Sequence, residues 1–325
     1  NTGNDTDVTN AFIKLVSFAV GGEALNIGNG FWGQGQPSTI LNAFFNKYIA
    51  EPISSASTAI ASIHVNQLSS LSSGSVVSDW NGYIQTNNSL RPTYYTGSLG
   101  INYNPQAYVN FNLGTSLTKQ NINFNCGTNG GFTIMLCVRP NSQYDYQTYL
   151  YCRDNSGNNI IQLYSTDTNV TYSTNMVLYV QNGNTAMIAD IATGFIDWRR
   201  YVIYTIRVDN NEKTYEMFNQ DNFTSPRKKG SFNTVIADRT GYNISFGLAG
   251  ANTNYPVSFT PNASDYCVGS SYIFDRPLSN AELNQMYAWM YMGNTKQTTF
   301  GLIDFERIKY YPNYSPYLGI WNRQN

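Results

Sequence analysis

The feature that most constrains the fold is a succession of short β-prone runs between about residues 75 and 275. These runs are rich in Tyr, Ile, Val and Phe, and turn signals such as Asp154–Gly157 and Asn182–Asn184 separate them. Such a pattern predicts a β-sandwich or barrel, and we see no tandem repeat of fixed period that would indicate a propeller. The predicted strands are 106–112, 131–139, 147–153, 159–164, 175–181, 185–190, 200–208, 213–219, 242–249 and 266–274.

The charge content excludes several classes of protein. Only 12% of the 325 residues are charged, whereas an average soluble domain has about 25%. The 19 Lys and Arg against 20 Asp and Glu give none of the cationic surplus that binding to nucleic-acid phosphates requires. The 15% aromatic content argues against disorder, and no apolar run reaches the roughly 18 residues of a membrane span.

Helical patterns are few. Ser279 followed by Glu282 is typical of a capping box, and apolar residues at helical spacing follow it. Spacing also predicts helices over about 39–50 and 57–71, and the apolar run 11–19 predicts a strand.

Cysteine and histidine are too scattered for a zinc site. No cysteine pair has CxxC spacing, and His64 is the only histidine, so the clustered ligands that zinc requires are missing. For the lone His64 we favour a packing or surface role. We also favour free, buried thiols over two disulfides, for which three connectivities would be open; the four cysteines are Cys126, Cys137, Cys152 and Cys267.

Four segments, taken in order, resemble the concanavalin A-like superfamily with its laminin-G-type jelly roll. The segments are Val77–Asn81 with Leu90–Tyr94, then Ala107–Phe111, Gly131–Pro140 and Tyr272–Leu283. The resemblance implies an all-β concanavalin A-like β-sandwich (jelly roll) with a short C-terminal helix, whose outer sheet faces carry Tyr, Thr and Asn. It covers about 76–293. We expect 1–75 to be an N-terminal arm or assembly segment with extra helix and strand, and 294–325 to be an aromatic C-terminal tail.

The family includes glycoside hydrolases, sugar-binding lectins and structural modules, so function has to be argued from a site. Hydrolysis usually needs two carboxylates beside the glycosidic bond. The chain has six Glu, and its nearest approach to the glucanase pattern is Leu302–Glu306, which has Leu302 where the first Glu belongs. We therefore expect a protein that is not an enzyme and has no catalytic residues.

Sugar binding would use aromatic faces and nearby amide or carboxylate groups. The candidate carbohydrate-binding residues are Trp80, Tyr94, Tyr95, Tyr144, Asp145 and Tyr146, and the last three lie in the loop 141–147. No cofactor is required by the sequence. Calcium is the one ion for which oxygen ligands stand out, although the DNSGN segment also reads as an ordinary turn, which we favour. The calcium candidates are Asp154, Asn155 and Asp167.

Low charge, the N-terminal arm and the aromatic tail favour a structural or surface protein, either a virion coat or an extracellular appendage. Arms and tails of this kind suit contacts with other structural protein subunits. We expect an extracellular or virion-surface location, without nucleic acid or a membrane span. The alternative is a glycan-binding adhesin or lectin, and a glycoside hydrolase is a weaker third hypothesis.

Overall fold

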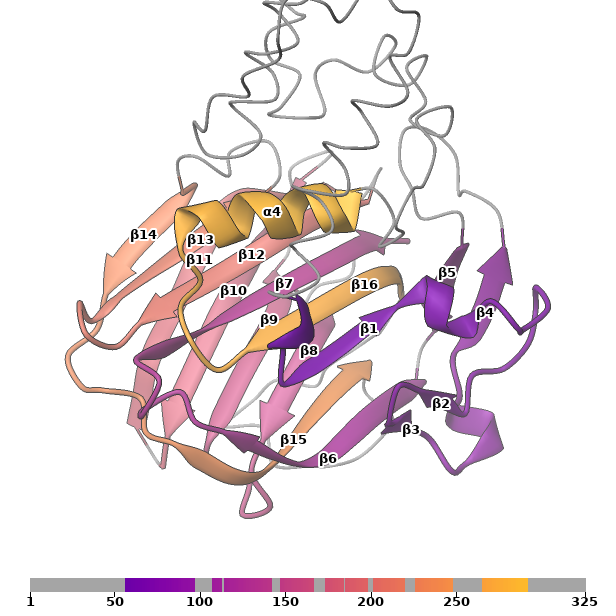
Figure 1. The fold of residues 1–325 in the computed structure, drawn as a ribbon, viewed down its shortest axis with the longest axis horizontal. Coiled ribbons are helices and arrows are strands. Elements are labelled where there is room, and N and C mark those ends of the chain that lie inside the picture. Colours follow the sequence, from indigo (N-terminus) through magenta and orange to yellow (C-terminus); the bar gives the residue numbers. More distant parts are fainter. Residues whose placement is uncertain are drawn as a thin grey trace, which may run out of the picture. The chain divides into compact units, whose positions relative to one another are not determined.

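The computed structural model describes residues 56–96, 107–112, 114–141, 147–166, 173–183, 185–197, 201–219, 226–247 and 265–291 (Figure 1). The chain divides into two compact units. Ala59–Asn219 with Ser225–Pro277 forms one unit, and it contains all of the described strands. The other unit comprises Asn1–Thr58, Gln220–Thr224 and Leu278–Asn325.

Sheet A of the first unit has eight antiparallel strands. Its order is β14 (Lys228–Ser231), β13 (Thr214–Asn219), β12 (Val202–Asp209), β7 (Gly131–Pro140), β16 (Tyr266–Phe274), β5 (Ala107–Phe111) and β4 (Thr93–Thr96). Strand β1 (Ala61–His64) also pairs with β16, along Ser270–Ile273, whereas β5 pairs with the preceding residues Tyr266–Val268.

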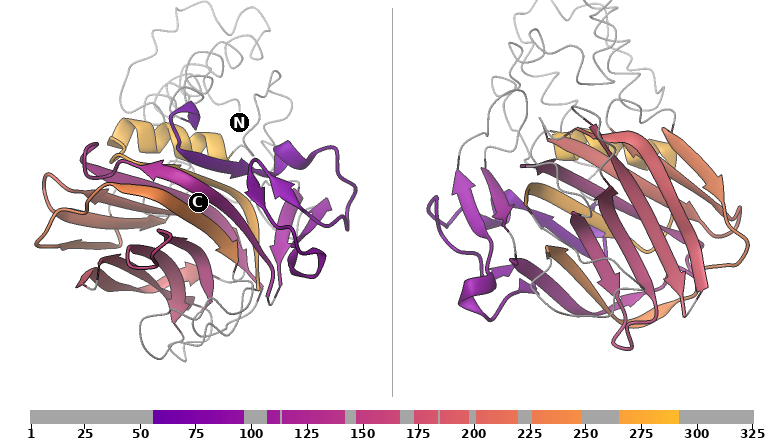
Figure 2. Two further views of the ribbon diagram at one scale, coloured as in Figure 1. Left: turned by 90° about the horizontal axis from the view of Figure 1, so that it is seen from below. Right: turned by 180° about the vertical axis from the view of Figure 1, so that it is seen from behind.

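Sheet B is also antiparallel and eight-stranded. Its order is β11 (Thr185–Asp197), β10 (Ser173–Asn182), β9 (Ile160–Thr166), β8 (Thr148–Arg153), β15 (Arg239–Gly247), β6 (Ser116–Phe124), β3 (Tyr83–Ile84) and β2 (Asp79–Trp80). The two sheets lie face to face as two layers (Figure 2). Two short 3₁₀ turns, η3 (Val65–Leu68) and η4 (Asn88–Leu90), connect strands at the N-terminal end.

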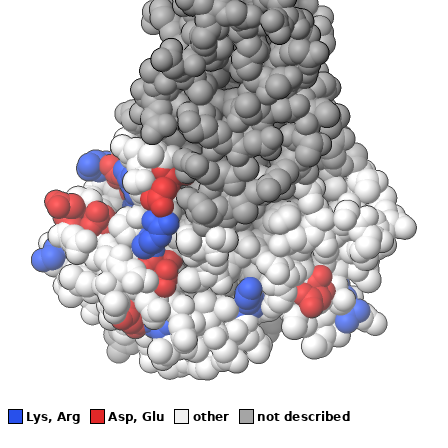
Figure 3. Space-filling view, in the orientation of Figure 1, with Lys and Arg blue, Asp and Glu red and all other residues white. Residues whose placement is uncertain are grey.

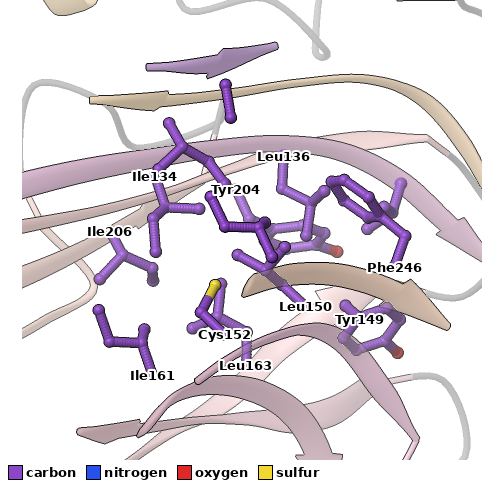
Figure 4. Packing of buried hydrophobic residues seen from close by; sticks show 14 of the residues in the cluster. Ile134, Leu136, Tyr149, Leu150, Cys152, Ile161, Leu163, Tyr204, Ile206 and Phe246 are labelled. Carbon is purple, nitrogen blue, oxygen red and sulfur yellow. The ribbon is translucent and has the colours of Figure 1, made fainter. Parts of the chain in front are cut away.

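The hydrophobic core fills the space between the sheets (Figure 4). Ile134 and Leu136 of β7 face Leu150 of β8 and Leu163 of β9, and all four are almost completely buried. Each such side chain stabilises the fold by about 1.5–3 kcal/mol relative to an exposed one. The predicted all-β sandwich is therefore confirmed.

The outer face of sheet A departs from the prediction. Successive residues of a strand point to opposite faces, so Met135 lies on the face opposite Leu136, together with Ile203 and Phe218 of the neighbouring strands. All three are buried. Tyr, Thr and Asn were expected on the outer faces, and at the centre of sheet A this is wrong. The uninterrupted apolar run of β7 fits a strand buried on both faces.

The predicted helix over 57–71 is also wrong where the structure describes strand β1 and turn η3. Ala61 and Ile63 are buried while Ser62 and His64 are part-exposed, which is the two-residue period of a strand. Because β1 pairs with β16, the sandwich begins before residue 76. The predicted strand 11–19, the helix 39–50 and the tail 294–325 lie outside the described residues.

Helix α4 (Asn280–Tyr291) belongs to the second unit and confirms the capping prediction. The Ser279 backbone N–H donates to Glu282 Oε2 (2.9 Å), and the Glu282 N–H donates to Ser279 Oγ (3.3 Å). In the part of the chain that the structure describes, no helix has the length and apolar character needed to cross a membrane.

Candidate functional site

The candidate site lies on the outer face of sheet A, where β4 and β5 meet. Tyr94 and Val109 are paired in register and belong to the core. Their neighbours Tyr95 and Tyr108, which form the next pair, therefore point to the opposite face. Asn110 shares that face with Tyr108 because it lies two residues further along β5.

Tyr95 and Tyr108 form a stacked, part-exposed aromatic pair. Their ring centroids are 5.3 Å apart and the ring planes are inclined by 24°. Burial raises the pKa of Tyr108, and the neighbouring Cys267 and Tyr95 raise it further, while Arg139 lowers it. The two rings offer aromatic surface, and the Tyr108 hydroxyl beside it keeps its proton at neutral pH.

A hydrogen-bonded group of amides and one carboxylate adjoins this pair. Asn141 Nδ2 donates to Asn110 Oδ1 (2.7 Å) and to Asp265 Oδ1 (2.9 Å). Asn110 Nδ2 donates in turn to Asn112 Oδ1 (2.8 Å). We call Tyr95, Tyr108, Asn110, Asn141 and Asp265 the tyrosine–asparagine patch; all five side chains are part-exposed.

A buried thiol supports the patch from the middle of the sheet. Cys267 is directly opposite Asn110 on one side and Arg139 on the other. Its Sγ lies 3.2 Å from Asn141 Oδ1 and 3.4 Å from Asn110 Oδ1, so the single S–H proton is shared between these two acceptors. Burial raises the pKa of Cys267 to about 11, so the group at neutral pH is an S–H donor and not a thiolate nucleophile.

The loop predicted to bind sugar is anchored at this patch. The backbone N–H of Asn141 donates to the Asp265 carbonyl oxygen (2.9 Å), and Gln147 Nε2 donates to the same oxygen (2.8 Å). Both ends of the loop 141–147 are thus tied to Asp265. The candidates Tyr144, Asp145 and Tyr146 themselves lie outside the described residues.

Two of the predicted sugar-binding aromatics are core residues, which corrects the prediction for them. Trp80 is 0% exposed, and its Nε1 donates to the His64 carbonyl oxygen (3.1 Å). Tyr94 is 4% exposed and packs in the core. Neither side chain is accessible to a ligand, whereas Tyr95 of the same motif is part-exposed.

The calcium candidates Asp154 and Asn155 lie in a turn. The Asp154 carboxylate accepts from the backbone N–H groups of Asn158 (3.0 Å) and Asn159 (3.4 Å) and from the Asn159 side chain. Although burial would raise the pKa of Asp154, these bonds and one from Ser156 lower it. Asn155 Oδ1 accepts from Asn243 Nδ2 (2.9 Å), and Asp167 lies outside the described residues. Within the described ranges, no three His, Cys, Asp or Glu side chains form a group that could hold a metal ion.

The remaining titratable candidates have structural positions. His64 ends β1, and burial lowers its pKa. All four cysteines are buried and free, as favoured from their spacing. Burial raises the pKa of Cys126 and Cys137 to about 12.

Sequence reasoning missed four members of the patch: Tyr108, Asn110, Asn141 and Asp265. The alternation in Ala107–Phe111 was a usable signal, because it places Tyr108 and Asn110 together on the polar face of a strand. Asp265 had no such signal, since 124 positions of sequence separate it from its partner Asn141.

Charged side chains are sparse around this end of the sandwich. In Figure 3 most of the Lys, Arg, Asp and Glu side chains lie over the side formed by β13 and β14, and few lie on the side of β2, β3 and β4. Three ion pairs lie over the side of β13 and β14, and they are Arg207–Glu216, Lys229–Glu216 and Lys228–Asp190.

The fold defines a β-sandwich protein, and the solved structures reported below resemble it at low sequence identity. No family model and no curated protein sequence matches the chain. Among solved structures it is similar to the CBM40 of the Ruminococcus gnavus IT-sialidase, with TM-score 0.38 and 14% identity over 51% of this chain and 92% of that one. It is also similar to domain 4 of AbnA, a GH43 extracellular arabinanase from Geobacillus stearothermophilus, in complex with arabinotriose, with TM-score 0.44 and 12% identity over 70% and 98%. A third is the botulinum neurotoxin serotype D binding domain, with TM-score 0.42 and 12% identity over 72% and 51%. These similarities are low, so the functional argument below rests on the patch.

Proposed function

We propose that this chain is a non-enzymatic, extracellular glycan-binding protein and that the tyrosine–asparagine patch is its binding site. The observation that carries the proposal is the part-exposed Tyr95–Tyr108 pair next to the Asn110–Asn141–Asp265 network. Sugars present apolar C–H faces and hydroxyl groups together. Aromatic rings bind the former, and amide and carboxylate groups bind the latter.

The hydrogen-bonding capacity of the network supports the proposal. Asn110 Nδ2 donates one of its two hydrogens to Asn112, and Asn110 Oδ1 accepts from Asn141 and Cys267. The second Nδ2 hydrogen is therefore left for a ligand. Because Asn141 and Asp265 hold one another in place, the polar groups are oriented before a ligand arrives. A preformed site of this kind loses less entropy on binding.

Binding is favoured over hydrolysis by the number of carboxylates. Glycoside hydrolysis usually uses two carboxyl groups about 5–9.5 Å apart. Of the described residues, the patch contains one, Asp265. The two hypotheses differ in a direct assay, because a hydrolase would release reducing sugar from an oligosaccharide that a lectin leaves intact.

A structural role in a virion coat or extracellular appendage is the other function that the sequence predicted. It depends on the N-terminal arm and on the tail 294–325, and the tail and most of the arm lie outside the described residues. That role stays a prediction, and it is compatible with sugar binding at the patch.

The test is a glycan array of neutral and acidic oligosaccharides, followed by calorimetric titration of the strongest array ligand. We expect Tyr95→Ala and Tyr108→Ala each to weaken binding about tenfold or more, the equivalent of 1.4 kcal/mol. The matched control is Tyr179→Ala, which removes a part-exposed tyrosine from sheet B and should leave binding unchanged.

Two results would overturn the proposal. One is a folded protein that binds no glycan on the array. The other is equal loss of binding in Tyr95→Ala and Tyr179→Ala, because the ligand would then not be recognised at the patch. Circular dichroism of each variant separates loss of binding from loss of fold.

A further inference from the structure

Among the described residues, the strand orders of sheets A and B end at four strands, β14, β4, β11 and β2, while the four-residue β1 lies off this order beside β16. Three of these four end strands are protected against pairing with another chain. Strand β14 is four residues long, and its Lys228 and Lys229 both form ion pairs. Strand β2 has two residues. Short length and lysine are common protections for an edge.

Strand β4 is protected by its own chain. The Tyr94 carbonyl oxygen accepts from the Gly74 N–H (2.8 Å), and the Tyr94 N–H donates to the Ser75 carbonyl oxygen (2.8 Å). The Val77 N–H likewise donates a hydrogen bond to the Pro92 carbonyl oxygen (2.8 Å). The preceding segment therefore already covers the outer side of β4.

Strand β11 differs from the other three. It runs for thirteen residues, Thr185–Asp197, and contains no Lys, Arg or Pro. Among the described residues its only paired neighbour is β10. Between two irregularities, Ile188–Ala192 pairs in continuous register with Met176–Val180. A long edge with a regular stretch and without Lys or Pro is a template for adding another strand.

The side chains of β11 also suit an interface. Ile191 is 46% exposed, and Ala189 is exposed on the same face of the sheet. The one charged residue in the regular stretch, Asp190, is neutralised within the chain. Its Oδ1 lies 3.0 Å from Lys228 Nζ, and its Oδ2 accepts from the Tyr215 hydroxyl.

We infer that β11 is the contact through which two copies of this chain pair, antiparallel and about a twofold axis, so that sheet B continues from one copy into the other. A second copy fits because the regular stretch carries no uncompensated charge that would repel its own copy: the Asp190 carboxylate of each copy is already paired with Lys228 of the same chain. A twofold contact closes on itself and forms a dimer, not a fibre.

The test is the mass of the intact chain in solution, measured by sedimentation over a wide concentration range. We expect a dimer of twice 36.4 kDa. Ile191→Lys should weaken dimerisation about tenfold or more, because a twofold contact centred on Ile188–Ala192 brings the two introduced lysines together as near neighbours on one face of the paired strands, where like charges are destabilising. Ala189→Lys, at a smaller side chain of the same face, should do the same and serves if Ile191→Lys misfolds.

The matched control is Ile84→Lys, the same substitution at a side chain 50% exposed on β3 of the same sheet. It should leave the dimer intact. A wild-type monomer at every concentration overturns the inference, as would occur if another part of the chain covered β11. A dimer that resists both β11 variants, or that Ile84→Lys weakens equally, overturns it as well. Sugar binding by the monomer is a separate result, so either proposal can fail alone.

Discussion

Tyr266→Phe is expected to destabilise the sandwich strongly although it removes a single oxygen atom. Tyr266 of sheet A is fully buried, and its hydroxyl accepts from the Gly247 N–H (2.7 Å) and donates to the Tyr149 carbonyl oxygen (2.8 Å), both in sheet B. The substituted ring can keep its stacking on Phe111, at a centroid distance of 5.4 Å. The change in the free energy of unfolding of this variant therefore reports on the two hydrogen bonds that join the sheets.

The magnitude follows from what is left behind. A buried backbone group without its partner costs about 1–3 kcal/mol. Two such groups, less the relief of no longer burying a hydroxyl, give an expected loss of about 2–4 kcal/mol in the free energy of unfolding. Burial raises the pKa of Tyr266, so the hydroxyl keeps its proton throughout the neutral range.

Urea denaturation measures this loss as a lower midpoint with an unchanged slope. The control is Tyr179→Phe, which removes a part-exposed hydroxyl bonded to Gln181 Oε1 (2.7 Å) and should change stability by less than about 0.5 kcal/mol. If Tyr266→Phe is no more destabilising than Tyr179→Phe, the hydroxyl does not join the sheets as described.

Three further results are expected. Burial would raise the pKa of Asp190, but Tyr215 and Lys228 lower it. The stability that this carboxylate contributes is therefore present above its pKa in the unfolded chain and is lost as pH falls through its pKa in the folded protein. Asp190→Asn should accordingly reduce the dependence of unfolding on acid pH. Gly230→Ala should destabilise by about 1–3 kcal/mol, because its Cβ would lie 2.1 Å from Tyr215 Oη, and Tyr215→Ala in the same chain should remove most of that extra cost in a double-mutant cycle. Native protein at neutral pH should react with Ellman's reagent at none of its thiols, and unfolded protein at all four, since these residues are buried and free: Cys126, Cys137, Cys152 and Cys267.

The strand pattern was readable from the sequence because most strands carry a strong local signal. The predicted strand 131–139 contains the uninterrupted apolar run Ile134–Val138, and it became the central strand β7. Strand β6 was missed because it is mostly polar, with Lys119, Gln120 and Asn121 in its middle, and it owes its conformation to pairing with β15. The segment 57–71 failed for the same reason: its apolar spacing suits a helix, but part of it pairs with the edge of β16, and tertiary pairing overrides local preference.

The candidate site was readable only in part. Tyr94 and Tyr95 are adjacent and chemically identical, yet one lies in the core and the other on the patch. A strand's register decides which residue faces which side, and no property of the residue itself contains that information. Trp80 illustrates the same limit, because an aromatic ring that could bind sugar is equally suited to a core. Asp265 joins the patch through pairing of distant strands, which local patterns do not specify.

The two proposals together predict avidity for surfaces. A chain that pairs through β11 carries two patches, and a second binding event on a glycan-coated surface then becomes intramolecular, which can raise apparent affinity by about 10²–10⁴. Ile191→Lys should therefore weaken binding to a surface coated with the strongest array oligosaccharide by about tenfold or more, while binding to the same oligosaccharide free in solution is unchanged. Tyr95→Ala should weaken both. Surface plasmon resonance and calorimetry measure the two affinities. If Ile191→Lys weakens binding to the free sugar as much as to the surface, β11 would act on the sugar site itself, and pairing would not be the source of the difference.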